Sequence, residues 1–103
     1  MIDTNEVCIY DCETLVEGLP DPTRDVLKIF GCYSYKTNKY YLITNIEQMK
    51  KIVAAHKFLV GFNNKGYDNP ILERHGVSLK YKTIIDLREI FKSLPIEVQN
   101  GDE

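Results

Sequence analysis

The chain has 103 residues, of which 44% are hydrophobic and 27% charged, and its formal net charge is −2. This length supports one small domain, and the ordinary balance of apolar and charged residues excludes extended disorder. No apolar run approaches the roughly 20 residues of a membrane-spanning helix, and no basic-then-apolar leader opens the chain. We therefore expect an intracellular, cytoplasmic protein with no membrane partner. Because the chain is not basic overall, binding to nucleic acid would need a local site or bound cations.

Three strands are predicted in the first half of the chain. Residues 6 to 13, EVCIYDCE, are apolar at both alternating sets of positions up to Asp11, which is typical of a central strand covered on both faces. A loop rich in proline and glycine follows over residues 15 to 25. Residues 26 to 35 and 39 to 43 are rich in β-branched and aromatic side chains around the turn KTN, which predicts a hairpin. The cysteines in these strands are predicted to be buried, reduced thiols: Cys8, Cys12 and Cys32.

Helices and strands alternate after the hairpin. Thr44 and Glu47 have the spacing of a capping box, and apolar residues at helical intervals predict a helix to about His56. Residues 58 to 63, FLVGFN, predict a fourth strand. Asn69 followed by proline predicts a second helix, which ends at Gly76.

The last predicted elements are a short strand and a helix. Residues 82 to 87, KTIIDL, predict the fifth strand. Asp86 and Glu89 form a second capping box, so we expect Asp86 to cap a helix that ends before Pro95. The tail EVQNGDE is polar and shows no periodicity.

The order β-β-β-α-β-α-β-α predicts an α/β fold in which residues 1 to 103 form one domain. Three leading strands followed by helix–strand alternation imply a mixed five-stranded sheet with flanking helices. We expect the chain to stop short of the end of its domain.

Carboxylates stand where two predicted strands end. Asp11 and Glu13 are two residues apart, so they project from one face, roughly 6.5 to 7 Å apart along the strand, and a hard cation could bridge them. Asp68 follows the fourth strand and stands beside a helix start. The alternatives are that Asp11 caps the loop, that Glu13 lies beyond the strand in water, and that Asp68 is stabilised by the helix N-terminus.

These stretches carry a resemblance to a known family. YDCET resembles the first motif, D-x-E, of the DEDD-type 3′–5′ exonucleases in the ribonuclease H-like superfamily. GFNNKGYDNPIL resembles their second motif, and its spacing is most similar to the proofreading domains of family B DNA polymerases and to stand-alone phage exonucleases. The resemblance covers residues 6 to about 92 and implies a ribonuclease H-like fold for them.

The resemblance also implies a two-metal mechanism with Mg²⁺ or Mn²⁺. Asp11 would contact both metals, Glu13 would hold the metal beside the nucleophile, and Asp68 would hold the second metal. The substrate would be a single-stranded 3′ end, with DNA favoured, although no motif residue identifies a contact to the 2′-OH of RNA. The substrate-binding residues that the motifs imply are Thr14, Leu15, Asn63 and Tyr67.

The third motif of the family, which supplies the fourth acid and a general base, has no match here. Tyr81 lies five positions before Asp86 instead of four, and Asp86 is better explained as a helix cap. His56 and His75 lie outside any motif, and we expect surface or core roles for both. We interpret the chain as the N-terminal part of a longer exonuclease domain, inactive by itself and with apolar surface that favours association between copies.

Two alternatives of other classes remain. One is a ribonuclease H-like module that binds nucleic acid or protein without cleaving. The other is an unrelated small α/β domain whose acids are caps and surface groups. Metal binding would separate the second alternative from the rest, and turnover would separate the first from an enzyme.

Overall fold

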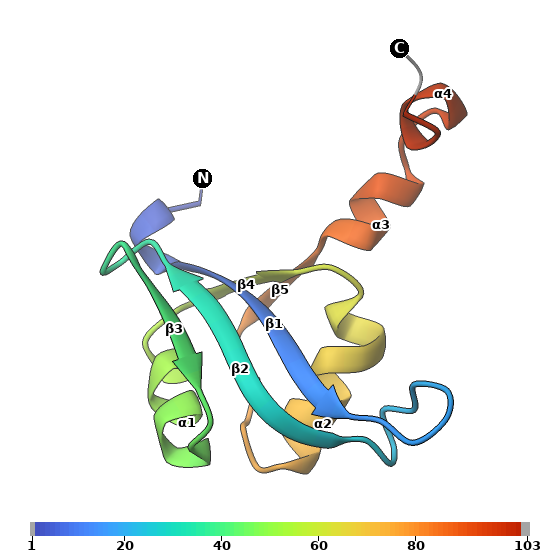
Figure 1. Ribbon diagram of the computed structural model, residues 1–103. Coiled ribbons are helices and arrows are strands. Elements are labelled where there is room, and N and C mark those ends of the chain that lie inside the picture. The colour runs from blue at the N-terminus through green and yellow to red at the C-terminus, as the bar shows by residue number, and fades with distance from the viewer. Residues whose placement is uncertain (1, 102–103) are drawn as a thin grey trace.

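A computed structural model describes residues 2–101 and contains a five-stranded mixed sheet in the order β3-β2-β1-β4-β5 (Figure 1). The hairpin strands β1, β2 and β3 pair antiparallel, and β4 and β5 continue the sheet in parallel from β1. This confirms the predicted α/β fold. The strands are β1 (Val7–Leu15), β2 (Val26–Ser34), β3 (Lys39–Ile43), β4 (Phe58–Gly61) and β5 (Thr83–Asp86).

The helices confirm the predicted order and add short elements to it. The predicted helices are α1 (Ile46–Ala54), α2 (Asn69–Arg74) and α3 (Leu87–Lys92). The added elements are a 3-10 turn η1 (Thr4–Glu6), a π-helical turn η2 (Asn64–Asp68) and α4 (Ile96–Gln99). None of the helices within residues 2–101 is long and apolar enough to cross a membrane.

Helix α4 contradicts the prediction of an irregular tail. Pro95 stands at its N-cap, where the fixed φ of proline and its missing N–H suit the first turn. The Gln99 amide then donates to the carbonyl oxygens of Lys92 and Leu94, at 3.1 and 2.7 Å. Together α3 and α4 extend away from the sheet (Figure 1).

The core lies between the sheet and helices α1 and α2, which cover the same face. Met49 and Val53 from α1, and Ile71 and Leu72 from α2, are fully buried against the sheet. The three cysteines are free and buried, as predicted. The buried apolar residues of the sheet are Cys8, Tyr10, Cys12, Leu27, Phe30, Cys32, Ile43 and Leu59.

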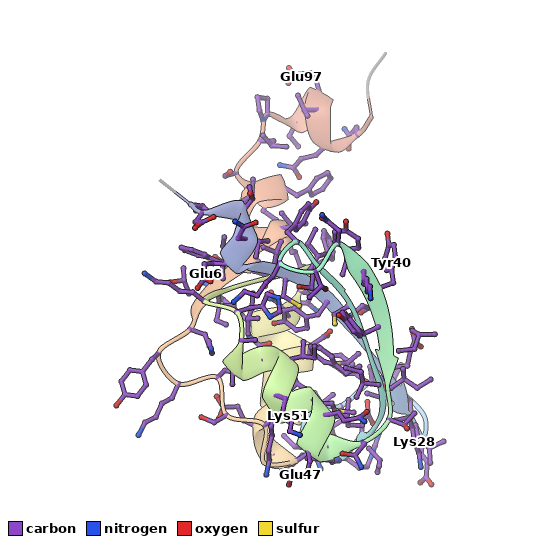
Figure 2. The ribbon with its side chains drawn as sticks, turned by 90° about the vertical axis from the view of Figure 1, so that its left-hand side faces the viewer. Glu6, Lys28, Tyr40, Glu47, Lys51 and Glu97 are labelled. Carbon is purple, nitrogen blue, oxygen red and sulfur yellow. The ribbon has the colours of Figure 1, made fainter. Side chains whose placement is uncertain are left out.

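The opposite face of the sheet is open, which contradicts the prediction that the first strand is covered on both sides. Ile9, Asp11 and Glu13 are exposed along β1. Across the sheet from them, Tyr40 and Leu42 of β3 are 83% and 82% exposed. Figure 2 shows α1 on one side of the sheet and Tyr40 on the other. The apolar residues on this face line an open groove of about 380 Å³. Because these residues are apolar, the sequence of β1 shows the same alternation as a strand buried on both faces.

Helix α1 begins one residue later than its predicted cap. Asn45 is the N-cap, and its side chain accepts a hydrogen bond from the Gln48 N–H at 3.1 Å. The predicted capping box of Thr44 and Glu47 is therefore wrong. Asparagine is as good a cap as threonine, so the two neighbouring positions compete, and spacing alone cannot choose between them.

Both histidines have structural roles, as expected. The Nδ1–H of each ring donates to the carbonyl oxygen four residues earlier, at 2.7 Å for His56 and 2.8 Å for His75. The Nε2 of His56 accepts from the Ser34 hydroxyl at 2.6 Å, and that of His75 accepts from the Leu27 N–H at 3.3 Å. The two rings thus tie α1 and α2 to β2.

Asp86 caps α3, as predicted, and it also holds the segment before η2. Its Oδ1 accepts from the N–H of Arg88 at 3.0 Å and from that of Asn63 at 2.7 Å. Its Oδ2 accepts from the Lys65 N–H at 3.3 Å. One buried carboxylate therefore fixes both the start of α3 and the start of η2.

We expect Asp86→Ala to lower the free energy of unfolding by about 2 to 4 kcal/mol, since it removes a cap and leaves buried N–H groups without partners. Urea unfolding followed by circular dichroism measures the change. Asp3→Ala is the control, because Asp3 caps only the exposed turn η1 and should cost less than about 1 kcal/mol. Equal losses in the two variants would contradict the bridging role of Asp86.

Candidate functional site

The site lies where β1 extends past β4. Parallel pairing between the two strands covers Val7 to Ile9, whereas β1 continues to Leu15. The Cys12 N–H therefore lies beyond the last paired residue of β4. The Asp68 carboxylate takes the place of the missing strand, and its Oδ2 accepts from this N–H at 3.0 Å. Asp68 stands at the N-cap position of α2 but makes no side-chain capping bond there, so a capping hydrogen bond does not account for its position.

The turn η2 delivers Asp68 to this edge. Asn63 adopts a left-handed backbone conformation, φ 56°, which turns the chain from β4 into η2. The buried Asn64 side chain donates to the Tyr10 hydroxyl at 2.8 Å, and Tyr10 in turn donates to Asn69. These contacts attach both ends of η2 to the middle of β1.

Asp11 and Glu13 lie on the open face of the same strand. Asp11 pairs with Gly31 of β2, four residues before β1 ends, so it does not cap the loop. Glu13 pairs with Ile29 and lies inside the strand, so the alternative that places it beyond the strand is also wrong. Both side chains are exposed and unobstructed by α1 and α2.

The electrostatics of the site are dominated by buried negative charge. Asp68 is 5% exposed, and its pKa is raised to about 6, mainly by desolvation and also by the nearby Asp11 charge, while the hydrogen bond from the Cys12 N–H opposes the rise. Burial also raises the pKa of the Cys12 thiol, with Asp68 and Asp11 adding to the effect. Asp11 and Asp68 are thus close enough to repel each other, and a bound cation would relieve this repulsion.

Two of the four predicted substrate-binding residues meet beside the carboxylates. The Thr14 and Tyr67 hydroxyls lie 2.8 Å apart. Leu15 is exposed at the end of β1. The Asn63 side chain lies over the turn, because a Cβ on Gly66 would stand 3.0 Å from its Oδ1. The Tyr67 N–H donates to the Asn63 carbonyl oxygen at 3.0 Å, but among the described residues no side-chain hydrogen bond joins Leu15 or Asn63 to the Thr14–Tyr67 pair.

Asp25 also contacts these residues, and no sequence pattern predicted it. The Tyr67 hydroxyl donates to Asp25 Oδ2 at 2.6 Å. Burial raises the pKa of the Tyr67 phenol, and the bond to Asp25 adds to the effect. Asp25 lies in the loop of prolines and glycine, where an aspartate is ordinary turn chemistry, so no local pattern identifies it.

The donor set at this edge consists of carboxylate oxygens, the ligands that Mg²⁺ and Mn²⁺ prefer. Over the described residues 2–101, no three His, Cys, Asp or Glu side chains are grouped so that they could hold a metal ion together. The structure brings Asp11 and Asp68 into electrostatic contact and places Glu13 on the same face as Asp11. The metal site itself stays a prediction.

No family profile matches the chain, and no curated protein matches it. Among solved structures, the chain is similar to the family B DNA polymerase from the hyperthermophilic archaeon Pyrobaculum calidifontis, with a TM-score of 0.70 and 20% sequence identity. The similarity covers 86% of this chain and 16% of the polymerase chain. At this identity the likeness establishes a shared fold with a part of that polymerase.

The raised pKa of Asp68 predicts that the protein without metal loses stability as the pH rises. The unfolded chain ionises near pH 3.8 and the folded chain near pH 6, so the unfolded state binds fewer protons between these values. We expect the free energy of unfolding to fall by on the order of 2 to 3 kcal/mol across this window. Urea unfolding from pH 3.5 to 7 measures it.

Asp68→Asn is the matched variant, because its amide oxygen can still accept from the Cys12 N–H while the charge is absent. It should be more stable than the wild type at pH 7 and equal to it near pH 4. If the pH dependence of the two proteins were the same, burial of the Asp68 charge would not be its source.

Proposed function

We propose that this chain forms the metal-binding edge of a 3′–5′ exonuclease that hydrolyses phosphodiester bonds of nucleic acid. One observation carries the proposal: Asp68 accepts a hydrogen bond from Cys12, the middle residue of the D-x-E stretch, next to Asp11, and stays buried there despite its charge. A carboxylate kept in this unfavourable position is a candidate for chemistry.

Divalent cations suit these residues. Mg²⁺ commonly uses one or two protein carboxylates and completes its shell with water and substrate phosphate oxygens, so a cage of three ready side chains is not required. When bound, such cations supply a hydroxide nucleophile and stabilise the leaving oxygen. Asp11 and Glu13 present their charge on the open face, and the Cys12 N–H holds Asp68 in place beside them.

The remaining motif residues would position the end of the substrate. Thr14 and Tyr67 hold each other by a hydrogen bond next to Glu13 and Asp68 in the chain. Leu15 offers an exposed apolar surface, and Asn63 starts the turn that carries Tyr67. We assign a single-stranded 3′ end to this position. DNA is the favoured substrate, and the fold shared with part of a DNA polymerase supports a nucleic acid in general.

We expect Mn²⁺ to stabilise the wild-type chain at pH 7, because a ligand at about 100 times its dissociation constant adds about 2.7 kcal/mol to the free energy of unfolding. Asp11→Asn and Asp68→Asn should lose this effect, and Glu73→Gln, which changes an exposed carboxylate on α2, should keep it. Thermal unfolding with and without Mn²⁺ measures the shift. Equal stabilisation of all four proteins would overturn the metal assignment.

Cleavage by the chain itself should be slow, because the third motif, which supplies the general base in the family that the chain resembles, has no match here, and losing a base typically costs about 10²- to 10⁴-fold. Single-stranded DNA labelled at its 5′ end and incubated with Mn²⁺ should shorten stepwise from its 3′ end. Asp11→Asn should abolish the shortening. Products that persist in Asp11→Asn, or that arise from internal cuts, would contradict a 3′–5′ exonuclease that uses Asp11.

The open face predicts self-association at high concentration, because its exposed apolar residues form one contiguous surface. Leu42→Lys should shift the protein toward the monomer, since Leu42 is exposed on this face, on the edge strand β3 opposite Gly31. Leu19→Lys is the control, because Leu19 is as exposed but lies in the loop. Sedimentation velocity measures the distribution between monomer and larger species, and a wild type that stays monomeric at high concentration would contradict the prediction.

A further inference from the structure

A buried carboxylate stands behind the Thr14–Tyr67 pair. Asp25 is only 1% exposed, and its Oδ2 accepts from the Asp21 N–H at 2.9 Å and from the Tyr67 hydroxyl at 2.6 Å. Its Oδ1 is buried without a hydrogen-bond partner among the described residues, and the Arg24 Nε lies 4.0 Å from it. Burial of this side chain is costly, and the local contact with the Asp21 N–H does not account for the hydrogen bond from Tyr67.

The carboxylate is held rigidly in place. The Arg74 guanidinium donates to the backbone oxygens of Asp25 and Pro22, the latter at 3.3 Å, which attaches the loop to α2. The Arg24 guanidinium donates to the backbone oxygens of Glu17 and Leu19 at 2.6 and 2.9 Å. Asp25 therefore keeps facing Tyr67.

This arrangement sets the direction of the hydrogen bonds. A phenol has one proton, and a carboxylate oxygen that already takes a backbone N–H acts as an acceptor, so Tyr67 donates to Asp25. The Tyr67 oxygen can then only accept from Thr14, 2.8 Å away. The single proton of the Thr14 hydroxyl then points toward Tyr67. The lone pairs of the Thr14 oxygen that face away from Tyr67 can only accept a hydrogen bond.

We propose that Asp25 is a positioning residue that, through Tyr67, makes Thr14 an acceptor toward the substrate. The identity of the ligand rests on the proposed function. A terminal nucleotide offers phosphate oxygens, which only accept, and a sugar hydroxyl, which can donate. Thr14 is half-buried and adjoins Glu13, so the group it selects is the free 3′-hydroxyl of the terminal nucleotide.

The test compares two oligothymidylates that differ only in the last sugar, which carries a 3′-hydroxyl or a 3′-hydrogen. Binding is measured by fluorescence anisotropy in Ca²⁺, so that affinity is read without turnover. The wild type should bind the 3′-hydroxyl end about 3- to 10-fold more tightly, the size expected for one net hydrogen bond.

Variants separate the positioning role from a merely structural one. Tyr67→Phe and Asp25→Ala should lose the preference, because Thr14 can then turn its proton outward. Asp25→Asn should keep it, because the amide oxygen can stand at the position of Oδ2 and accept both donors. If Asp25→Ala does not fold, as judged by circular dichroism, Tyr67→Phe carries the comparison.

Tyr41→Phe is the matched control, because Tyr41 also pairs with a threonine, Thr37, at 2.8 Å, at the other side of the sheet. It should keep the preference. Equal binding of both oligonucleotides by the wild type, or a preference that survives in Tyr67→Phe, would overturn this inference and leave the proposed function standing. Failure of the wild type to bind either oligonucleotide would overturn the proposed function and this inference with it.

Discussion

The site depends on a segment of β1 that is paired with β2 along one edge and has no strand along the other. Strand β1 continues past the end of β4, so on the β4 side its Cys12 N–H has no strand to pair with. A buried N–H without a partner costs about 1 to 3 kcal/mol, so the fold needs an acceptor at this position. Asp68 supplies it from 56 residues away. The same hydrogen bond that completes the sheet places a third carboxylate next to the D-x-E stretch.

The charge of Asp68 is unfavourable in this buried position, and the surrounding hydrogen bonds compensate for it. A neutral acceptor would complete the sheet equally well, whereas Asp68 brings a charge into a buried position beside Asp11. Tyr10 and Asn64 bind each other across β1 and η2, and Asp86 holds the start of the turn. Several hydrogen bonds thus fix a segment that its own charge destabilises, which is the pattern expected where function overrides local stability.

The strands and their order could be predicted because alternation and turn residues are local signals. The open face could not be predicted, because an apolar residue such as Ile9 has the same sequence pattern whether a helix or solvent covers it. The π-turn η2 escaped prediction because its backbone bonds give no side-chain periodicity, and a glycine between two polar residues suggested only a tight turn. Asp11 and Glu13 were predicted at the end of the strand, whereas both lie inside β1. The contacts that Asp68 and Tyr67 make with β1 were not derivable from spacing.

Asp25 illustrates why part of the site was beyond sequence reasoning. Its partner Tyr67 lies 42 residues away, and nothing in the loop distinguishes it from Asp21, which only closes a turn. The hairpin and the crossover through α1 and β4 must both be in place before the two side chains can meet. Such residues can be recognised in a structure by their burial, because a buried aspartate needs hydrogen-bond partners to replace water.

The two contacts between β1 and η2 have the same direction, and this links the metal proposal to the positioning proposal. The Cys12 N–H donates to Asp68, and the Thr14 hydroxyl donates to Tyr67, so in both contacts β1 provides the donor and η2 the acceptor. The atoms left facing outward are acceptors: the oxygens of Asp11, Glu13 and Thr14. A surface made of acceptors repels phosphate unless cations lie between them. Divalent cations would therefore be needed between a phosphodiester and this edge, whereas hydrogen-bond donors of a nucleotide, such as a sugar hydroxyl, could bind the edge directly.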